Sequence, residues 1–183
     1  MQINIRGDLV DLSHLKTLVR HVDLDLRGNL KKKGARVEFR FSNHCYSRGP
    51  KKGETIPDNM LVSDGSDKHP RLRIFCDKRY GLSQALVQHI DDLINENRLV
   101  QRSRHLNFFA APLVTVDENG QACERFYYIF MCAKKKQDTN QPPKISIFVE
   151  SAYPEDPDIP SPGKEGDPLL FSVMLGNIWE NRR

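Results

Sequence analysis

Alternation of apolar and polar side chains over residues 36–48 constrains the fold more than any other feature of this chain. Successive side chains of an extended segment point to opposite faces, so one face carries Val37, Phe39 and Phe41. If the extended conformation continues past Asn43, the opposite face carries Arg36, Glu38, Arg40, Ser42, His44, Tyr46 and Arg48. The pattern predicts a strand with one buried face and one face suited to binding an anion.

Other segments predict further strands of a mainly antiparallel sheet. Residues 71–80 alternate in the same way, and residues 144–153 place Ile145, Ile147 and Val149 on one face, with Ser151 and Tyr153 at the same parity. The Asn119-Gly120 pair between residues 106–116 and 124–133 is a strong hairpin signal. These segments together predict a meander.

Helical spacing appears in two places. Leucines and valines at positions 12, 15, 18, 19 and 22 follow the N-cap candidates Asp11 and Ser13, which predicts an N-terminal helix. Residues 82–94 carry a second apolar stripe after a break at Gly81. The sequence therefore predicts an α+β fold, with an N-terminal helix and one central helix packed on a twisted, mainly antiparallel sheet.

The length of 183 residues and the 38% hydrophobic content favour a single domain over residues 1–183. Within it we expect a helical element at 1–30, the core sheet at 36–155, an irregular Pro- and acid-rich loop at 154–168 and a strand or short helix in the C-terminal element, 169–183.

The four cysteines lack CxxC spacing, which favours reduced thiols over a zinc site or a disulfide framework. Without a signal sequence or a long apolar run, we expect a cytoplasmic protein with no membrane contact.

The net charge of +4 is small but unevenly distributed. Acidic residues gather between positions 150 and 167, whereas Lys and Arg cluster elsewhere. The basic clusters are residues 31–33, 51–52, 71 with 73, 78–79, 102 with 104, 134–136 and 182–183. Such separation favours an anionic partner, although lysines in loops also serve solubility alone.

The predicted elements follow in the order helix, His-bearing strand, second basic strand, hairpin and closing strand, and the closing strand ends in Glu-Ser-Ala-Tyr-Pro at 150–154. This order resembles that of the small metal-independent nucleases grouped around barnase, EndoU, colicin and RelE. Phage and mobile-element members often end with a similar aliphatic-aliphatic-Ser/Thr-x-Tyr-Pro strand. The resemblance covers residues 36–155. It implies a toxin-type ribonuclease that cleaves RNA through the 2'-hydroxyl, with a protein antitoxin as partner and no cofactor or metal.

Metal-free RNA cleavage requires a base, an acid and cations around the phosphate. His44 is the candidate base or acid because its unperturbed pKa is near physiological pH, and Glu150 is a second acid-base candidate. Ser151 and Tyr153 are candidates for orienting the RNA backbone. Arg79 is the catalytic candidate for holding the phosphate.

The remaining candidates are residues that bind RNA without reacting. Arginines present two parallel N–H donors to a phosphate and aromatic rings stack on bases. The predicted nucleic-acid-binding residues are Arg40, Tyr46, Arg48, Arg71, Arg73 and Lys135.

Two other functions stay open. A non-catalytic nucleic-acid-binding or protein-interaction module of a mobile element uses the same basic strands and needs no catalytic residue. A divalent-metal DNA nuclease requires converging carboxylates, for which Asp64, Asp67, Asp77, Glu150 and Asp156 are candidates. Structural roles also compete with the catalytic ones: Arg79 can cap the sheet and pair with Asp77, and Tyr153 can pack its ring. The sequence leaves the oligomeric state undetermined.

Overall fold

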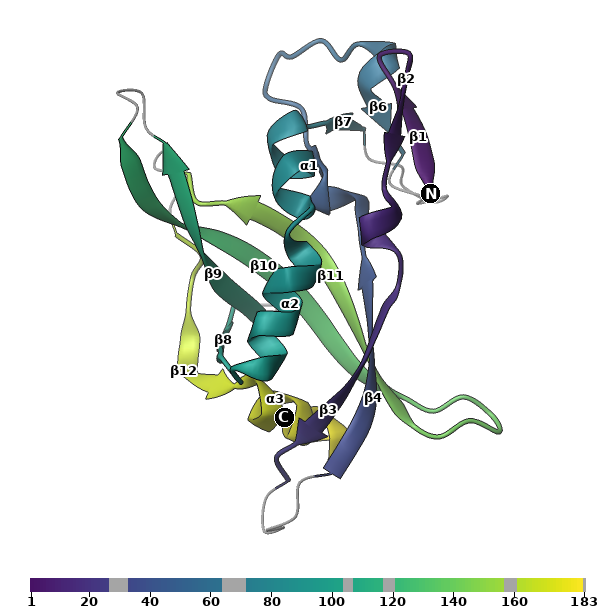
Figure 1. The fold of residues 1–183 in the computed structure, drawn as a ribbon, viewed down its shortest axis with the longest axis vertical. Coiled ribbons are helices and arrows are strands. Elements are labelled where there is room, and N and C mark those ends of the chain that lie inside the picture. Colours follow the sequence, from purple (N-terminus) through teal and green to yellow (C-terminus); the bar gives the residue numbers. More distant parts are fainter. Residues whose placement is uncertain (27–32, 64–71, 104–106, 117–120, 157–160, 183) are drawn as a thin grey trace.

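The computed structural model describes residues 1–26, 33–63, 72–103, 107–116, 121–156 and 161–182. A curled seven-stranded sheet lies at its centre (Figure 1). Its strands, in spatial order, are β12 (Glu165–Leu170), β8 (Leu99–Arg102), β9 (Asn107–Val116), β10 (Ala122–Lys136), β11 (Lys144–Pro154), β4 (Lys33–Phe41) and β3 (Leu18–Leu24). Neighbours pair antiparallel except β11 and β4, which run parallel. The α+β fold and the mainly antiparallel sheet are as predicted.

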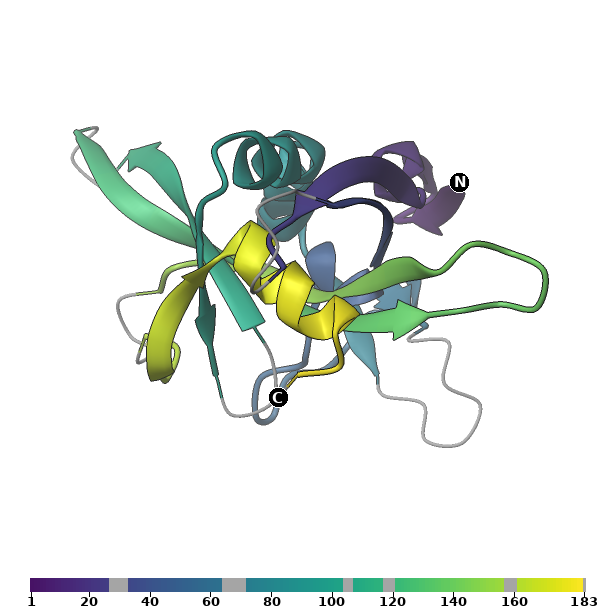
Figure 2. The same ribbon diagram turned by 90° about the horizontal axis from the view of Figure 1, so that it is seen from below.

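Among the described residues, three α-helices accompany the sheet, and short elements surround it. The helices are α1 (Asp77–Ser83), α2 (Leu86–Asn95) and α3 (Phe171–Trp179). Two small sheets pair β1 (Gln2–Ile5) with β2 (Asp8–Asp11), and β7 (Arg73–Phe75) with β5 (Ser47–Arg48) and β6 (Leu61–Val62). Single 3₁₀ turns lie at Ser13–Leu15, Asn43–Cys45 and Asp58–Met60. Figure 2 shows α3, in yellow, continuing directly from β12.

The core lies on one face of the large sheet. Leu86, Ile90 and Leu93 of α2 are fully or almost fully buried, at the spacing of one helical face. They belong to one apolar cluster with Tyr127, Ile129 and Met131 of β10 and with residues of α3. The even-numbered residues of β10 point to the opposite face, called here the outer face: Phe126, Tyr128, Phe130, Cys132, Lys134 and Lys136.

The prediction of an N-terminal helix is wrong. The segment forms a 3₁₀ turn at Ser13–Leu15 and then strand β3. Asp11 accepts hydrogen bonds from the amide and the hydroxyl of Ser13, which stabilises a local turn instead of a helix start. In β3, Val22 and Leu24 are buried while the residues beside them are exposed. This two-residue period and the pairing with β4 outweigh the helical spacing of the leucines.

The extended conformation predicted over residues 36–48 ends at Phe41. Within β4 the predicted faces are correct, because Val37 and Phe39 are buried and Arg40 is exposed. Ser42 then accepts a hydrogen bond from the amide of His44 through its hydroxyl, and a 3₁₀ turn follows. His44 and Tyr46 are therefore not on the strand that carries Arg40.

The other predicted elements are shifted rather than absent. The strand at 71–80 is shorter, because β7 ends at Phe75 and Asp77 begins α1. The hairpin pairing of β9 with β10 is as predicted, whereas its turn lies outside the described residues. The predicted irregular loop at 154–168 ends in strand β12, and α3 follows. All four cysteines are free. Among the described residues, no helix combines the length and apolar character needed to cross a bilayer.

Candidate nucleic-acid interface

A β-bulge in β11 determines which side chains share the outer face. Opposite β10, Phe130 pairs with Ser151 and Met131 pairs with Val149, so Glu150 is the extra residue. Beyond the bulge the alternation is inverted. Ala152 therefore enters the core, and the ring of Tyr153 packs on the outer face. The expectation that Tyr153 shares the face of Ile145 and Val149 is wrong for this reason.

A basic hollow lies on the outer face, across β4, β10 and β11. Its lining residues are Arg40, Cys132, Lys134, Lys136, Ser146, Phe148 and Glu150, and its volume is about 580 Å³. Phe148 is 36% exposed, and the Arg40 guanidinium lies 5.9 Å from the centroid of its ring. The hollow therefore combines cations with an accessible aromatic ring.

The cations of the basic hollow are not neutralised by nearby acids. In the described part of the chain, Arg40, Lys134 and Lys136 form no ion pair. Glu38, which points to the same face from β4, is engaged by Arg36 at 2.7 Å and by Lys144 at 3.1 Å. Glu150 is the one carboxylate among the residues that line the hollow. Three cations against one carboxylate leave the hollow net positive.

Aromatic rings continue the outer face beyond the basic hollow. Phe108, Tyr128 and Phe130 form a second buried cluster, against which Tyr153 packs. The rings of Phe130 and Tyr153 stack with centroids 5.3 Å apart and planes 17° apart. Phe130 lies between Tyr128 and Cys132 along β10, so the aromatic cluster adjoins the basic hollow.

A third region, the arginine cleft, brings two of the predicted catalytic residues together. Its lining residues are Arg48, Gly49, Lys51, Cys76, Lys78, Arg79, Tyr153, Pro154, Glu155 and Asp156, around a volume of about 440 Å³. The guanidinium of Arg79 lies 5.2 Å from the centroid of the Tyr153 ring. Burial lowers the pKa of Arg79 and raises the pKa of Tyr153, and the charge of Arg79 partly opposes the latter shift.

The arginines of this region bind protein groups. Nη1 of Arg79 donates to the carbonyls of His44 and Ser47, at 3.1 and 3.0 Å. Arg48 makes a two-pronged contact with Glu54, and this contact is the main reason why the pKa of Glu54 falls to about 2. Buried Arg73 donates to the hydroxyl and the carbonyl of Ser47. The contacts of Arg79 and Arg73 hold the segment from His44 to Ser47 against α1 and β7.

The other predicted site residues are dispersed. His44 is half-buried and lies in the 3₁₀ turn. Tyr46 is buried beside Phe75. Lys135 points to the core face, where its Nζ donates to the carbonyl of Trp179 at 2.9 Å and lies over the indole ring. Arg71 lies outside the described residues.

Lys134, Lys136 and Phe148 are among the residues of the basic hollow that were not predicted as site residues, together with Cys132 and Ser146. The signal was present, because alternation along β10 places Lys134 and Lys136 on the face opposite Lys135. The same alternation places Phe148 outward between the buried residues Ile147 and Val149.

Carboxylates for a metal site do not gather in the structure as described. Asp77 is bound by Arg6 at 3.0 Å, and Asp64 and Asp67 lie outside the described residues. Within the described ranges, no three His, Cys, Asp or Glu side chains come together as a metal-binding group.

Comparison with known proteins places the chain in a family. The model of the YjaZ family matches residues 2–179, which is nearly the whole chain. No curated protein and no solved structure matches significantly.

Proposed function

The chain belongs to the YjaZ family, and we propose that it binds single-stranded RNA on the outer face of its sheet without cleaving it. The observation that carries this proposal is the basic hollow, where Arg40, Lys134 and Lys136 surround the exposed ring of Phe148. Cations that lack acidic partners are available to RNA phosphates, and an exposed ring can stack on a base.

The sheet geometry favours a single strand over a duplex. Phe148 lies on the surface of the sheet among the cations, so a base must leave its helical stack to reach it. Base–aromatic stacking contributes about 1–3 kcal/mol per base and tolerates any sequence. Phosphate contacts are equally independent of sequence. We therefore expect binding with a broad sequence tolerance and a strong dependence on salt.

The salt dependence of binding tests this proposal. For single strands, the slope of log affinity against log salt changes by about 0.7 for each phosphate contact removed. The double variant Lys134→Gln/Lys136→Gln should therefore lower the slope measured with a labelled U12 RNA by about 1.4. Lys16→Gln, at an exposed position away from the hollow, is the control and should leave the slope unchanged.

Two results would contradict the proposal. The first is that wild-type protein fails to bind U12 at low salt. The second is that the double variant keeps the wild-type slope, since phosphate contacts would then lie elsewhere. Phe148→Ala adds an independent measurement, because loss of one stacked base should weaken affinity about 5- to 150-fold, as 1–3 kcal/mol implies.

RNA cleavage of toxin type is a second candidate function. The observation that favours it is the arginine cleft, where Arg79 and Tyr153 lie together. Incubation of purified protein with total RNA in EDTA tests it: a ribonuclease should degrade the RNA, and His44→Ala should not. Intact RNA after incubation with wild-type protein would reject this candidate, together with the antitoxin partner that it implies, and leave binding as the function.

A further inference from the structure

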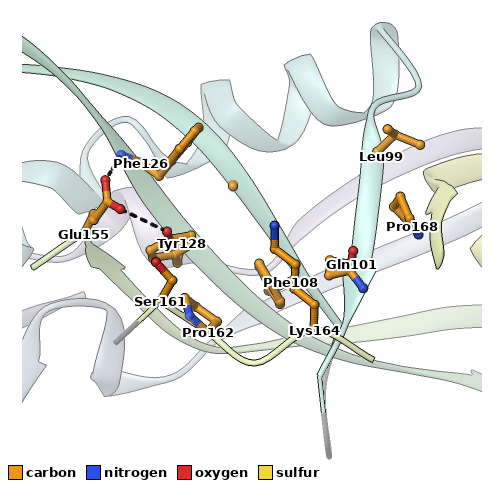
Figure 3. A pocket seen from close by; sticks show the side chains of 11 residues that line it. Leu99, Gln101, Phe108, Phe126, Tyr128, Glu155, Ser161, Pro162, Lys164 and Pro168 are labelled. Carbon is orange, nitrogen blue, oxygen red and sulfur yellow. Dashed lines mark hydrogen bonds between the residues drawn. The ribbon is translucent and has the colours of Figure 1, made fainter. Parts of the chain in front are cut away.

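We infer that a pocket at the far end of the outer face holds one guanine base of the bound RNA (Figure 3). This inference rests on the proposed function and adds a base preference to it. The pocket, called here the aromatic pocket, has a volume of about 420 Å³, which is within the range of small-ligand sites. Its lining comes from β8, β9, β10, Glu155 just after β11, the segment that leads into β12 and β12 itself.

Flat apolar side chains form much of the wall of the aromatic pocket. Phe108 and Tyr128 are almost fully buried and meet edge to face, with ring centroids 5.9 Å apart. Phe126 is 47% exposed and lies near Tyr128 at a centroid distance of 6.1 Å. Leu99 and Pro162 line the same pocket. Exposed aromatic surface beside buried rings suits a planar ligand that stacks.

Glu155 supplies the carboxylate of the aromatic pocket. Its two carboxylate oxygens accept from the amide of Phe126 at 3.3 Å and from the hydroxyl of Tyr128 at 3.4 Å (Figure 3). The amide of Glu155 donates to the carbonyl of Phe126 at 2.6 Å, which fixes the backbone of Glu155 against β10. A carboxylate has about four acceptor sites. Each oxygen therefore keeps one lone pair for a ligand.

Guanine is the base whose edge matches this carboxylate. Its ring N–H and its exocyclic amino group are adjacent donors, so both can donate to one carboxylate in a bidentate, charge-assisted contact. Adenine and cytosine place an acceptor beside their amino group, and uracil places acceptors on both sides of its N–H. Lys164 also lines the aromatic pocket and can donate to a base oxygen or a phosphate.

The aromatic pocket is close enough to the basic hollow for one strand to contact both. Tyr128 of the pocket and Cys132 of the hollow are four residues apart on β10, which is about 13 Å along a strand. The stacked rings of Phe130 and Tyr153 occupy the surface near this span. The RNA that contacts Lys134 and Lys136 can therefore extend a base to Glu155.

Fluorescence anisotropy with four labelled 12-mer RNAs tests this inference. One RNA is U12, and the other three carry a single central guanine, adenine or inosine. We expect the guanine RNA to bind about tenfold more tightly than the adenine RNA, as a bidentate contact discriminates between bases. Inosine, which lacks the exocyclic amino group, should bind with intermediate affinity. Glu155→Gln should reduce the guanine-to-adenine ratio to nearly one.

Two further variants make the result specific. Glu165→Gln removes an exposed carboxylate of β12 that is not among the residues lining the pocket, and should keep the tenfold ratio. Tyr128→Phe keeps the ring but removes the hydroxyl that orients Glu155, so it should lower the ratio even if Glu155→Gln fails to fold.

Equal binding of the four RNAs by wild-type protein would overturn the guanine pocket and leave RNA binding intact. A ratio that persists in a folded Glu155→Gln would also overturn it, whereas no binding to any RNA would reject the proposed function as well.

Discussion

The basic residues of this chain divide into two groups that differ in their contacts. Arg73 and Arg79 are buried or half-buried and donate to backbone carbonyls of His44 and Ser47, in the segment that follows β4. Lys134 and Lys136 are exposed on the outer face, where no described acid pairs with them. A guanidinium suits the first group because its planar donors can bridge several acceptors. An exposed ammonium suits the second because it remains available to a mobile anion.

Arg79 is expected to stabilise the fold. Arg79→Lys keeps the positive charge but loses the guanidinium, whose Nη1 bridges two carbonyls and which lies over Tyr153. We expect the free energy of unfolding in urea to fall by about 1–3 kcal/mol, the cost of leaving buried acceptors unpaired. The affinity for U12 should be unchanged in the folded variant.

The exposed neighbour of Arg79 provides the matched control. Lys78→Arg makes the reverse exchange in the same helix, at an exposed position, and should alter stability by no more than about 0.5 kcal/mol. If Arg79→Lys unfolds at the same urea concentration as wild-type protein, the carbonyl contacts of Arg79 contribute little to stability. A direct contact between Arg79 and RNA would then better explain the position of this side chain.

At the scale of elements, a single extra residue in β11 sets the composition of the outer face. Without the bulge at Glu150, strict alternation would direct Tyr153 toward the core and Ala152 outward. With it, Tyr153 stacks on Phe130 and receives the guanidinium of Arg79. The bulge therefore connects the aromatic cluster to the arginine cleft.

The packing of α3 depends on a glycine. A Cβ added to Gly176 would lie 2.0 Å from the carbonyl oxygen of Asp25, just after β3. Alanine is favoured over glycine inside a helix by about 1 kcal/mol, but this backbone clash outweighs that preference. We expect Gly176→Ala to lower the free energy of unfolding by about 1–3 kcal/mol, as overpacking typically does.

A second helical glycine supplies the control for that measurement. No atom outside its local backbone lies within 4 Å of a Cβ added to Gly81, in α1. Gly81→Ala should raise stability by up to about 1 kcal/mol. Equal and positive effects of both substitutions would show that α3 can shift away from Asp25 at little cost.

At the scale of the whole molecule, the two faces of the large sheet serve different purposes. One face buries α2 and α3 in the main core. On the other face, no described helix covers the basic hollow or the aromatic pocket. These sites draw on strands β4, β8, β9, β10 and β11, so they exist only when the sheet is assembled.

Stabilisation by RNA tests this dependence on the assembled sheet. A ligand that binds only the folded chain, present at 100 times its Kd, stabilises that chain by about 2.7 kcal/mol. Urea unfolding with U12 at that excess should show this increase for wild-type protein. At the same RNA concentration Lys134→Gln/Lys136→Gln should gain clearly less, because its Kd is higher. An equal gain for both proteins would show that the basic hollow does not hold the RNA.

Local patterns in the sequence were sufficient for the α+β class, the β9–β10 pairing and the inward residues of β4. Each depends on alternation or a turn signal within a few residues. The N-terminal segment shows where local patterns do not determine the structure. Leucines and valines at positions 12–22 have helical spacing, yet pairing with β4 makes residues 18–24 a strand.

The functional face required the tertiary structure. The sequence by itself determined that the chain carries basic strands with an anion-binding character, including Arg40 and the lysine run at 134–136. It could not determine that β11 bulges at Glu150 or that Arg79 turns to carbonyls of a distant loop. These features arise from contacts between segments far apart in the chain, and alternation within one strand carries no information about them. Only the assembled sheet decided which cations share a face with exposed aromatic rings.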